Sequence, residues 1–352
     1  MANAYERPAD EHVNWPRNIP YLAIHLIPFA AFFTGVTRFD VLLCIGLYCM
    51  RIFFITGVYH RYFSHRSYKM GRAMQFLMAV GGTLAVQKGP LWWAGHHRHH
   101  HKFSDQPADV HSPLKGLFWS HMGWIMCRKF EAAPTHLIND FAKFPELRWL
   151  DRYHWVPPTL LGVLVFAIGG WSALVVGFFL STVLCWHCTY MINSLTHLFG
   201  SRRYVTTDTS RNSLILGLLT FGEGWHNNHH YYQSSANQGF FWWEIDISYY
   251  ILRALSLVGL VRDLRTPPAH VLAANRIKDG HADIGMFQAN WTRAVAYLGH
   301  ARAHAGEYYE ERKRALDEFV ETTTRRAQNI AQMAPTEAAR RIASIAPKPV
   351  AE

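Results

Sequence analysis

Long apolar runs alternate with polar, histidine-rich segments over the first three quarters of the chain. Residues 21–36 and 41–59 are apolar runs separated by Thr37-Arg-Phe-Asp40, and residues 155–191 form a longer apolar run that contains Gly169-Gly170 and no charged residue. A helix needs about 20 apolar residues to cross a bilayer. The pattern therefore predicts two pairs of transmembrane helices, the second pair turning at the two glycines. For the first pair, two amphipathic helices lying on the membrane are the alternative.

A single charged residue, Arg51, interrupts the second apolar run. An Arg at the centre of a bilayer is costly. We therefore expect Arg51 near the membrane surface, with the helix continuing into water and carrying His60 there.

Shorter apolar segments predict helices that lie at the membrane surface. Residues 71–86, 214–221 and 240–260 are too short or too charged to span a bilayer. Further on, residues 308–344 are rich in Ala, Glu, Arg and Gln, which favours a cytosolic helix. We expect an all-α integral membrane protein in three parts: a polar N-terminal segment (residues 1–20), a membrane domain (21–265) and a cytosolic helical tail (266–352).

The distribution of basic residues predicts the orientation of the chain. The net charge is +10, but the Lys and Arg are scattered and match no nucleic-acid motif, so we expect no nucleic-acid partner. A basic face towards anionic membrane lipid, or towards an acidic redox partner, accounts for the excess. The Gly169-Gly170 turn has no basic neighbour, whereas the opposite ends of the runs carry Arg61, Arg66, Lys102, Arg128, Lys129, Arg202 and Arg203. The positive-inside rule then places the histidine-rich segments and both termini in the cytoplasm, on a multi-pass protein of the cytoplasmic membrane.

Nine histidines in the polar segments form a metal-ligand pattern. They are His60 and His65; His97, His100 and His101; His226, His229 and His230; and the single His197. In the second and third clusters the spacing is i, i+3, i+4, which places the rings on one helix face. Imidazole suits iron, copper, zinc and nickel, and about four or five ligands complete one such ion. Nine ligands therefore predict two ions side by side.

Other histidines and other metal chemistries fit the pattern less well. His96 and His99 fall off the shared face and are expected to be exposed, while His25, His154 and His187 are expected to be structural. No zinc-protease H-E-x-x-H string is present. A loose His-rich tract or a metal carrier is the remaining non-enzymatic alternative, but a transporter would place its ligands within the membrane spans.

The sequence resembles membrane fatty acyl desaturases of the stearoyl-CoA (delta-9) type, in a bacterial-like form. The resemblance is carried by Gly57-Val-Tyr-His-Arg-Tyr-Phe-Ser-His65, His97-Arg-His-His-His-Lys-Phe-Ser104, Asn193-Ser-Leu-Thr-His-Leu-Phe-Gly200 and Gly222-Glu-Gly-Trp-His-Asn-Asn-His-His230, and it extends over roughly residues 20–260. It implies four transmembrane helices under a cytosolic helical cap that holds a di-iron histidine-box site.

The resemblance also implies how the nine histidines divide between two iron ions. His60, His65, His97, His101 and His229 would hold one iron, and His100, His197, His226 and His230 the other, which Asn193 reaches through a water. Glu223, Asp105, Asp109 and Asp208 are candidates to fix the imidazole tautomers. Each of these carboxylates could equally be a simple surface residue.

The expected reaction is the O2-dependent desaturation of a long-chain fatty acyl group near carbon 9. The sequence has no flavin, haem or iron–sulfur signature, so the electrons would come from an external donor such as ferredoxin, rubredoxin or a small cytochrome b with its reductase. A histidine-box hydroxylase is the alternative, because the same oxidant can place oxygen on carbon.

The carrier of the acyl group is less clearly indicated. Arg128-Lys129 matches a basic pair that binds CoA phosphates in relatives, although it could be an ordinary basic pair. Lys88, Gly95 and His96 stand where those relatives have Asn, Arg and Asp. Acyl-CoA is the favoured substrate, with acyl groups on lipid or on a carrier protein as alternatives.

Overall fold

A computed structural model describes residues 8–277 and scattered positions between 299 and 328. The chain divides into two units, residues 1–287 and 288–352. The described part is mostly helical, as expected, with one antiparallel pair of short strands, β1 (Lys69–Met70) and β2 (Val261–Arg262). The described positions after residue 298 are helical, in keeping with the predicted tail helix, while residues 329–344 of that helix lie outside the described residues.

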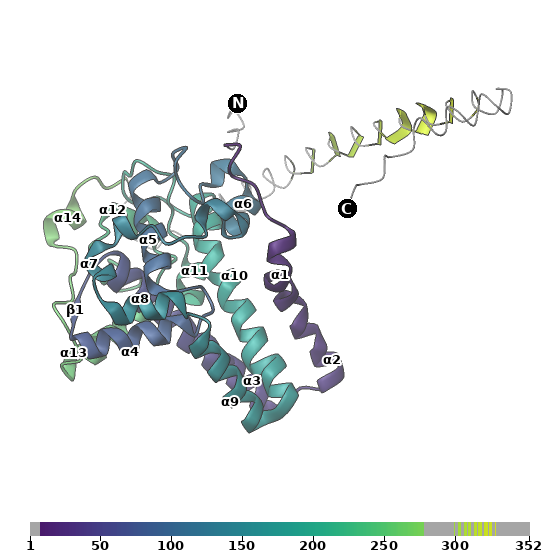
Figure 1. Cartoon of the computed structure of the whole chain (residues 1–352). Coiled ribbons are helices and arrows are strands. Elements are labelled where there is room, and N and C mark those ends of the chain that lie inside the picture. Colours follow the sequence, from purple (N-terminus) through teal and green to yellow (C-terminus); the bar gives the residue numbers. More distant parts are fainter. Residues whose placement is uncertain are drawn as a thin grey trace. The chain divides into compact units, whose positions relative to one another are not determined.

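Four helical arms correspond to the apolar runs (Figure 1). The first consists of η1 (Pro16–Asn18), α1 (Ile19–Leu26), η2 (Ile27–Ala30) and α2 (Ala31–Thr34), and the second of α3 (Arg38–Phe53) and the π-helix η3 (Phe54–Ser64). The third arm is α9 (Val156–Ser172), and the fourth is the π-helix η8 (Ala173–Leu180), α10 (Ser181–Ser194) and η9 (Leu195–His197). Segment η8 packs against α3, α9 and η2, so the four arms form one bundle.

The remaining helices are short and supply the part of the molecule that carries the polar segments. They are α4 (Arg72–Thr83), α5 (Pro90–Phe103), η4 (Pro113–Lys115), α6 (Leu117–His121), η5 (Gly123–Met126), η6 (Arg128–Phe130), η7 (Thr135–Leu137), α7 (Asn139–Ala142), α8 (Pro145–Arg152), α11 (Leu214–Leu219), α12 (His226–Tyr231), α13 (Ile247–Leu257) and α14 (Ala269–Ala273). We call the part formed by α4–α8 and α11–α14 the cap.

The corners between the arms follow from the local sequence. The Thr37 hydroxyl accepts a hydrogen bond from the Asp40 N–H, and the Asp40 carboxylate accepts one from the Thr37 N–H, which together start α3 as a capping box. Gly170 has φ +66°, a left-handed conformation that favours glycine, and it divides the helical stretch Val156–His197 into two arms. The predicted turn at the two glycines is therefore confirmed.

Among the described residues, two helical stretches are long and apolar enough to cross a membrane, Arg38–Ser64 and Val156–His197. Large apolar side chains on the arms face outward, with Phe32 87% and Phe33 93% exposed. Such surfaces on neighbouring helices need an apolar environment.

Arg51 is fully buried inside the protein. The helix continues beyond it through η3 to His60, as expected, while the depth of Arg51 in the membrane stays a prediction. Its Nε donates to the Leu84 carbonyl at 2.8 Å, and Nη1 donates to the Phe178 carbonyl at 3.2 Å and to the Ser181 hydroxyl. These oxygens satisfy Nε and Nη1, which lowers the cost of burying the guanidinium inside the helical bundle, while Nη2 has no hydrogen-bond partner among the described residues. Arg51 therefore fastens α3 to the fourth arm and to the loop after α4.

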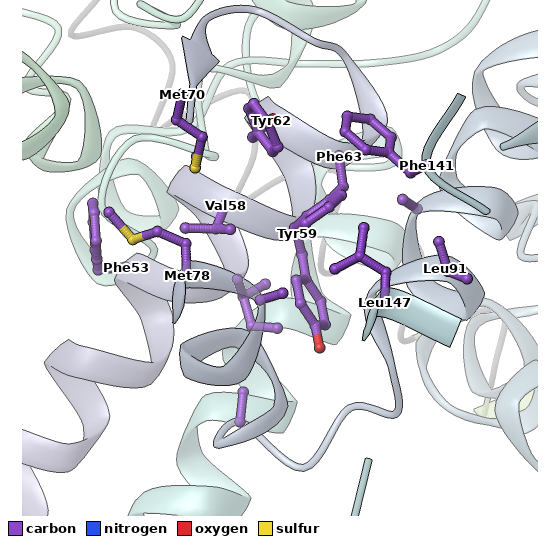
Figure 2. Packing of buried hydrophobic residues seen from close by; sticks show 14 of the residues in the cluster. Phe53, Val58, Tyr59, Tyr62, Phe63, Met70, Met78, Leu91, Phe141 and Leu147 are labelled. Atoms are coloured by element: carbon purple, nitrogen blue, oxygen red, sulfur yellow. The ribbon is translucent and has the colours of Figure 1, made fainter. Parts of the chain in front are cut away.

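The largest hydrophobic core among the described residues lies where η3 packs against the cap. Figure 2 shows its members Phe53, Val58, Tyr59, Tyr62, Phe63, Met70, Met78, Leu91, Phe141 and Leu147. Tyr59 and Phe63 are fully buried, and each such side chain contributes about 1.5–3 kcal/mol relative to its exposed state. This packing holds the π-helical segment in place and fixes the direction of the side chains on its other face.

The predicted surface helix over residues 240–260 is shorter than expected. Helix α13 begins only at Ile247, because the Asp246 carboxylate accepts the Tyr249 N–H at 3.0 Å and acts as its N-cap. The residues before Asp246 form turns, and Glu244 there accepts a hydrogen bond from the Asn228 amide of α12 at 2.8 Å.

Candidate metal centre

The structure gathers the nine histidines into two groups, of five and four. In the five-histidine group the ligand nitrogens of His60, His65, His97, His101 and His229 lie within 4.8 Å of one another. In the four-histidine group the same holds for His100, His197, His226 and His230. This division is the one that the resemblance implied.

A π-helix explains how His60 and His65 meet despite their five-residue spacing. The His65 N–H bonds to the His60 carbonyl at 3.2 Å, an i→i+5 contact. On an α-helix two residues five apart diverge, whereas a π-helical turn closes after five residues. The two ring centres are 4.7 Å apart.

Helices α5 and α12 each contribute ligands to both groups, which places the groups side by side. His97 and His101 of α5 join one group, while His100, which lies between them in the sequence, joins the other. The ring centres of His101 and His230, from different helices and different groups, are 4.5 Å apart. A pair of ions held there would be neighbours.

Four carboxylates hold imidazoles by the nitrogen that faces away from the groups. The pairs are His60 with Glu223, His100 with Asp109 (2.9 Å), His197 with Asp105 (3.2 Å) and His230 with Asp208 (2.6 Å). The carboxylate accepts the proton of Nδ1, so Nε2 keeps its lone pair for a metal ion. All four carboxylates are those that the sequence suggested.

The donor set fits transition-metal ions. The buried Nε2 atoms of His100 and His230 have no hydrogen-bond partner among the described residues, which is a costly state unless an ion is bound. Imidazoles without carboxylates in the groups suit iron, copper or zinc rather than magnesium or calcium. The residues present therefore fit two iron ions, the number that the family resemblance implies.

Burial keeps most of these imidazoles in the neutral form that binds metals. It lowers the pKa of His97, His101 and His229 well below the ordinary value, and lowers the pKa of His230 to about 4. For His100 burial acts in the same direction, but Asp109 outweighs it and the pKa is raised.

The paired carboxylates stay ionised although they are buried. Burial acts to raise the pKa of Asp105, but hydrogen bonds from His197 and Thr209 outweigh it and lower the pKa to about 2. Burial also acts to raise the pKa of Glu223, but the charges and hydrogen bonds of His60 and Arg61 outweigh it, so the pKa is lowered. Each of the four paired imidazoles therefore faces a negative charge at neutral pH.

Several residues that position the centre were not singled out from the sequence. Arg61 is fully buried and donates to Glu223 at 2.9 Å and to Asp246 at 2.8 Å. Because Asp246 is the N-cap residue of α13, these bonds connect the ligand-bearing η3 to the start of α13. The Asn212 side-chain oxygen accepts the N–H groups of Asn227 (2.9 Å) and Asn228 (3.2 Å), which fixes the first turn of α12. These contacts join segments that are distant in the sequence, so no local sequence motif predicts them.

Gln238 and His111 also lie against the ligands. The Gln238 amide is 3.3 Å from Nδ1 of His60 and 3.4 Å from Nδ1 of His229. The ring of His111 lies 4.2 Å from that of His100, and with Asp109 these two form a third cluster of possible ligands. A single Gln or His outside the repeated spacing carries no signal of its own in the sequence.

The other histidines that the structure describes lie outside the two groups. His25, His154 and His187 are among them, and His187 bonds to His121 at 2.9 Å. His96 was expected to be exposed but is buried, with Nδ1 donating to the Trp92 carbonyl at 2.8 Å. Trp124, distant in the sequence, covers its ring.

A cavity of about 270 Å³ leads from the surface to the histidines; we call it the mouth cavity. Its lining includes the exposed Arg17 and Arg128, the partly exposed Lys88, and also His97 and Asn193. Lys129, the other half of the basic pair, instead forms ion pairs with Asp10 (3.0 Å) and Glu11 (3.3 Å).

A second, smaller cavity of about 30 Å³ lies deeper; we call it the inner cavity. It shares Trp93, His97, Thr189 and Asn193 with the mouth cavity, and it is also lined by His60 and His226. Asn193 thus lies at the junction of the two cavities, beside ligands of both groups.

Comparison with known proteins gives the class of enzyme. Residues 39–259 match the family model described as fatty acid desaturase. The chain therefore belongs to the fatty acid desaturase family, as the sequence motifs indicated, and it is an oxidoreductase that desaturates fatty acyl groups.

Some of the relatives are named as desaturases of lipid-linked acyl groups, and others as desaturases of CoA-linked acyl groups. The chain is 35% identical over 264 residues to an sn-1 stearoyl-lipid 9-desaturase of Anabaena variabilis, which covers 72% of this chain and 94% of the relative. It is 38% identical over 265 residues to an sn-1 stearoyl-lipid 9-desaturase of Synechocystis sp., covering 72% and 80%. An acyl-CoA C20 delta-5 desaturase of Anemone leveillei is 35% identical over 233 residues, covering 64% and 73%.

Proposed function

We propose that this enzyme introduces a double bond near carbon 9 of a long-chain acyl group carried on a membrane lipid, at a di-iron centre held by the nine histidines. The observation that carries the proposal is the shared wall between the two histidine groups and the inner cavity, formed by His60, His97 and His226. An acyl methylene in that cavity lies directly against the ligands of both groups.

The division of ligands is part of the proposal. The five-histidine group would hold one iron and the four-histidine group the other, with Asn193 reaching the second through a water. Bound iron would supply activation of O2, which an unactivated C–H bond requires. Two hydrogens leave the substrate as a double bond forms, and two electrons from an external carrier, with two protons, complete the reduction of O2 to water.

The protein's own residues orient the ligands and exclude water. Glu223, Asp105, Asp109 and Asp208 hold four imidazoles in one tautomer, so their Nε2 atoms stay aimed at the centre. The inner cavity is mainly apolar, with Ile52, Ile55 and Ile192 in its wall. A methylene chain fits this lining, whereas water gains few partners there.

The charged residues at the mouth cavity favour a lipid carrier of the acyl group over CoA. Of the basic pair expected to bind CoA phosphates, Arg128 lines the mouth cavity, but Lys129 is neutralised by Asp10 and Glu11. The two relatives described first are named for lipid-linked stearoyl groups. Acyl-CoA is the second candidate, supported by Arg128 and by the Anemone relative.

The membrane arrangement extends the same proposal. We place the four arms across the bilayer, because their outward faces are apolar and Gly170 turns the last two into a hairpin. The cap, the histidines and both termini would then lie in the cytoplasm, where an electron donor such as ferredoxin, rubredoxin or a small cytochrome b can reach them. The three-part division at residues 20 and 265 stays a prediction.

The test is a reconstituted reaction with defined acyl donors. Purified protein would be loaded with iron, supplied with ferredoxin and its reductase, and given labelled stearoyl-lipid or stearoyl-CoA. A product that has two hydrogens fewer than the substrate supports desaturation. A product that has gained one oxygen would show that the enzyme is a hydroxylase instead. Turnover of stearoyl-CoA but not of stearoyl-lipid would overturn the lipid assignment.

A ligand variant tests the centre itself. His229→Ala removes a buried ligand of the five-histidine group and should abolish turnover and lower bound iron. His136→Ala is the matched control, because His136 is exposed and outside both groups. Wild-type iron content and activity in His229→Ala would refute the ligand assignment.

A further inference from the structure

A third and larger cavity lies among the arms rather than in the cap. This apolar groove of about 570 Å³ is bordered by Ile24 of α1, by Gly162 and Phe166 of α9, and by Phe178 of η8. It runs along α9 from Trp155 to Trp171, and no Asp, Glu, Lys or Arg lines it. Nothing in the reaction described above uses it.

The groove adjoins the mouth cavity. Val86 lines both spaces. On α1, Tyr21 lines the mouth cavity, and Ile24, one helical turn further along, lines the groove. The two spaces are therefore neighbouring compartments on one side of α1, and Val86 stands between them.

The divider between the compartments is held in a strained conformation. Val86 has φ +57° and Lys88 has φ +64°, which is uncommon for residues other than glycine and especially so for a β-branched one. The preceding backbone is tethered on both sides: the Arg51 guanidinium donates to the Leu84 carbonyl, and the Trp186 indole donates to the Ala85 carbonyl at 2.9 Å. Strain of this kind persists where the surrounding structure imposes it.

The dimensions and charges of the two compartments match a lipid with two chains. From residue 156 to residue 169, just before the turn at Gly170, α9 rises about 20 Å at about 1.5 Å per residue, whereas half of a hydrocarbon core about 30 Å thick is about 15 Å. The groove is therefore long enough for one acyl chain. Arg17, Lys88 and Arg128 line the mouth cavity together with Glu131, which pairs with Arg17, and this charged lining suits a polar headgroup.

We propose that the groove holds the second acyl chain of a diacyl glycerolipid while the first acyl chain occupies the mouth and inner cavities. This inference rests on the lipid-linked substrate of the proposed function and goes beyond it. The glycerol unit would lie at Val86, where the compartments meet. The second chain is surrounded by hydrocarbon before and after binding, so binding in the groove adds little apolar burial. Instead, the groove orients the lipid and so fixes how far the first chain reaches past the histidines.

Filling the groove separates two-chain from one-chain substrates. Gly162→Phe suits this purpose, because a Cβ at Gly162 would meet the Phe178 ring at 3.7 Å and the Leu174 side chain at 3.9 Å, which are ordinary contacts. The added ring would then occupy the groove. Gly46→Phe on α3 is the matched control, since a Cβ at that exposed position meets nothing within 4 Å.

Turnover would be measured with distearoyl glycerolipid and with the 1-stearoyl lysolipid, which has the same headgroup and one chain. Gly162→Phe should lower kcat/KM for the diacyl lipid by about tenfold or more and leave the lysolipid within about twofold of wild type, with Gly46→Phe unchanged on both. Equal losses on both substrates, or no loss on the diacyl lipid, would overturn the inference. A wild-type enzyme inactive on both lipids but active on stearoyl-CoA would instead defeat the lipid-linked substrate on which the inference rests.

Discussion

Replacing Glu223 by Gln tests whether the carboxylates set the strength of the metal centre. Glu223 is 5% exposed and accepts hydrogen bonds from His60 Nδ1 and from the Arg61 guanidinium. The substitution keeps the shape of the side chain but removes its charge. The amide can still accept the His60 proton through its oxygen, but Arg61 then faces a neutral group and retains only Asp246 and the Ala236 carbonyl.

The expected magnitudes follow from these contacts. Loss of a carboxylate partner behind a metal-binding histidine lowers metal affinity by about 10- to 100-fold, or about 1.4 to 2.7 kcal/mol. Breaking a buried ion pair costs about 3–5 kcal/mol when the remaining charge is left alone. Because Arg61 keeps Asp246, we expect a smaller loss of unfolding free energy, about 2–3 kcal/mol.

The assay is an anaerobic Fe(II) titration against a competing chelator, together with thermal unfolding of the metal-free protein. Asp263→Asn is the control, because Asp263 is 61% exposed and forms a surface ion pair with the exposed Lys69 at 2.8 Å. If Glu223→Gln bound iron as tightly as Asp263→Asn, the idea that Glu223 orients His60 would be wrong.

Two further outcomes are expected. Asn212→Ala removes the acceptor of the Asn227 and Asn228 N–H groups, so it should cost about 1–3 kcal/mol of stability, measured by chemical unfolding; the same midpoint as wild type would argue against its role at α12. In the metal-free protein, burial lowers the pKa of His97 and His229 below the unfolded value of about 6.5, so the unfolded state binds more protons and stability should fall as pH decreases below about 6.5, by about 1.4 kcal/mol per pH unit for each such histidine. His100 has the opposite sign but is one group against several, and a stability that rose between pH 6.5 and 5 would contradict this balance.

The sequence predicted those parts of the centre that depend on the spacing of residues close together in the chain. The i, i+3, i+4 histidines of α5 and α12 could be placed on a helix face directly from their numbers, and the Gly169-Gly170 turn followed from the conformational freedom of glycine. The split into five and four came from resemblance, since spacing alone left open which ring serves which ion.

The parts that the sequence missed depend on tertiary packing. A π-helix at residues 54–64 has no local signature, and it is fixed by the aromatic core around Tyr59 and Phe63. His96 is buried because Trp124 covers it from a later segment, and Lys129 is neutralised by the N-terminal residues Asp10 and Glu11. None of these contacts joins neighbours in the chain.

The sharing of α5 and α12 between both groups has a consequence for how the centre is assembled. The ligands of each group come from both helices, with His101 and His229 in one group and His100 and His230 in the other. An ion that draws the two helices together at one group also brings the ligands of the neighbouring group into register, and its loss loosens both. In the proposed di-iron centre, occupancy of the two positions would therefore be thermodynamically linked, and the centre would fill and empty cooperatively, as a single unit.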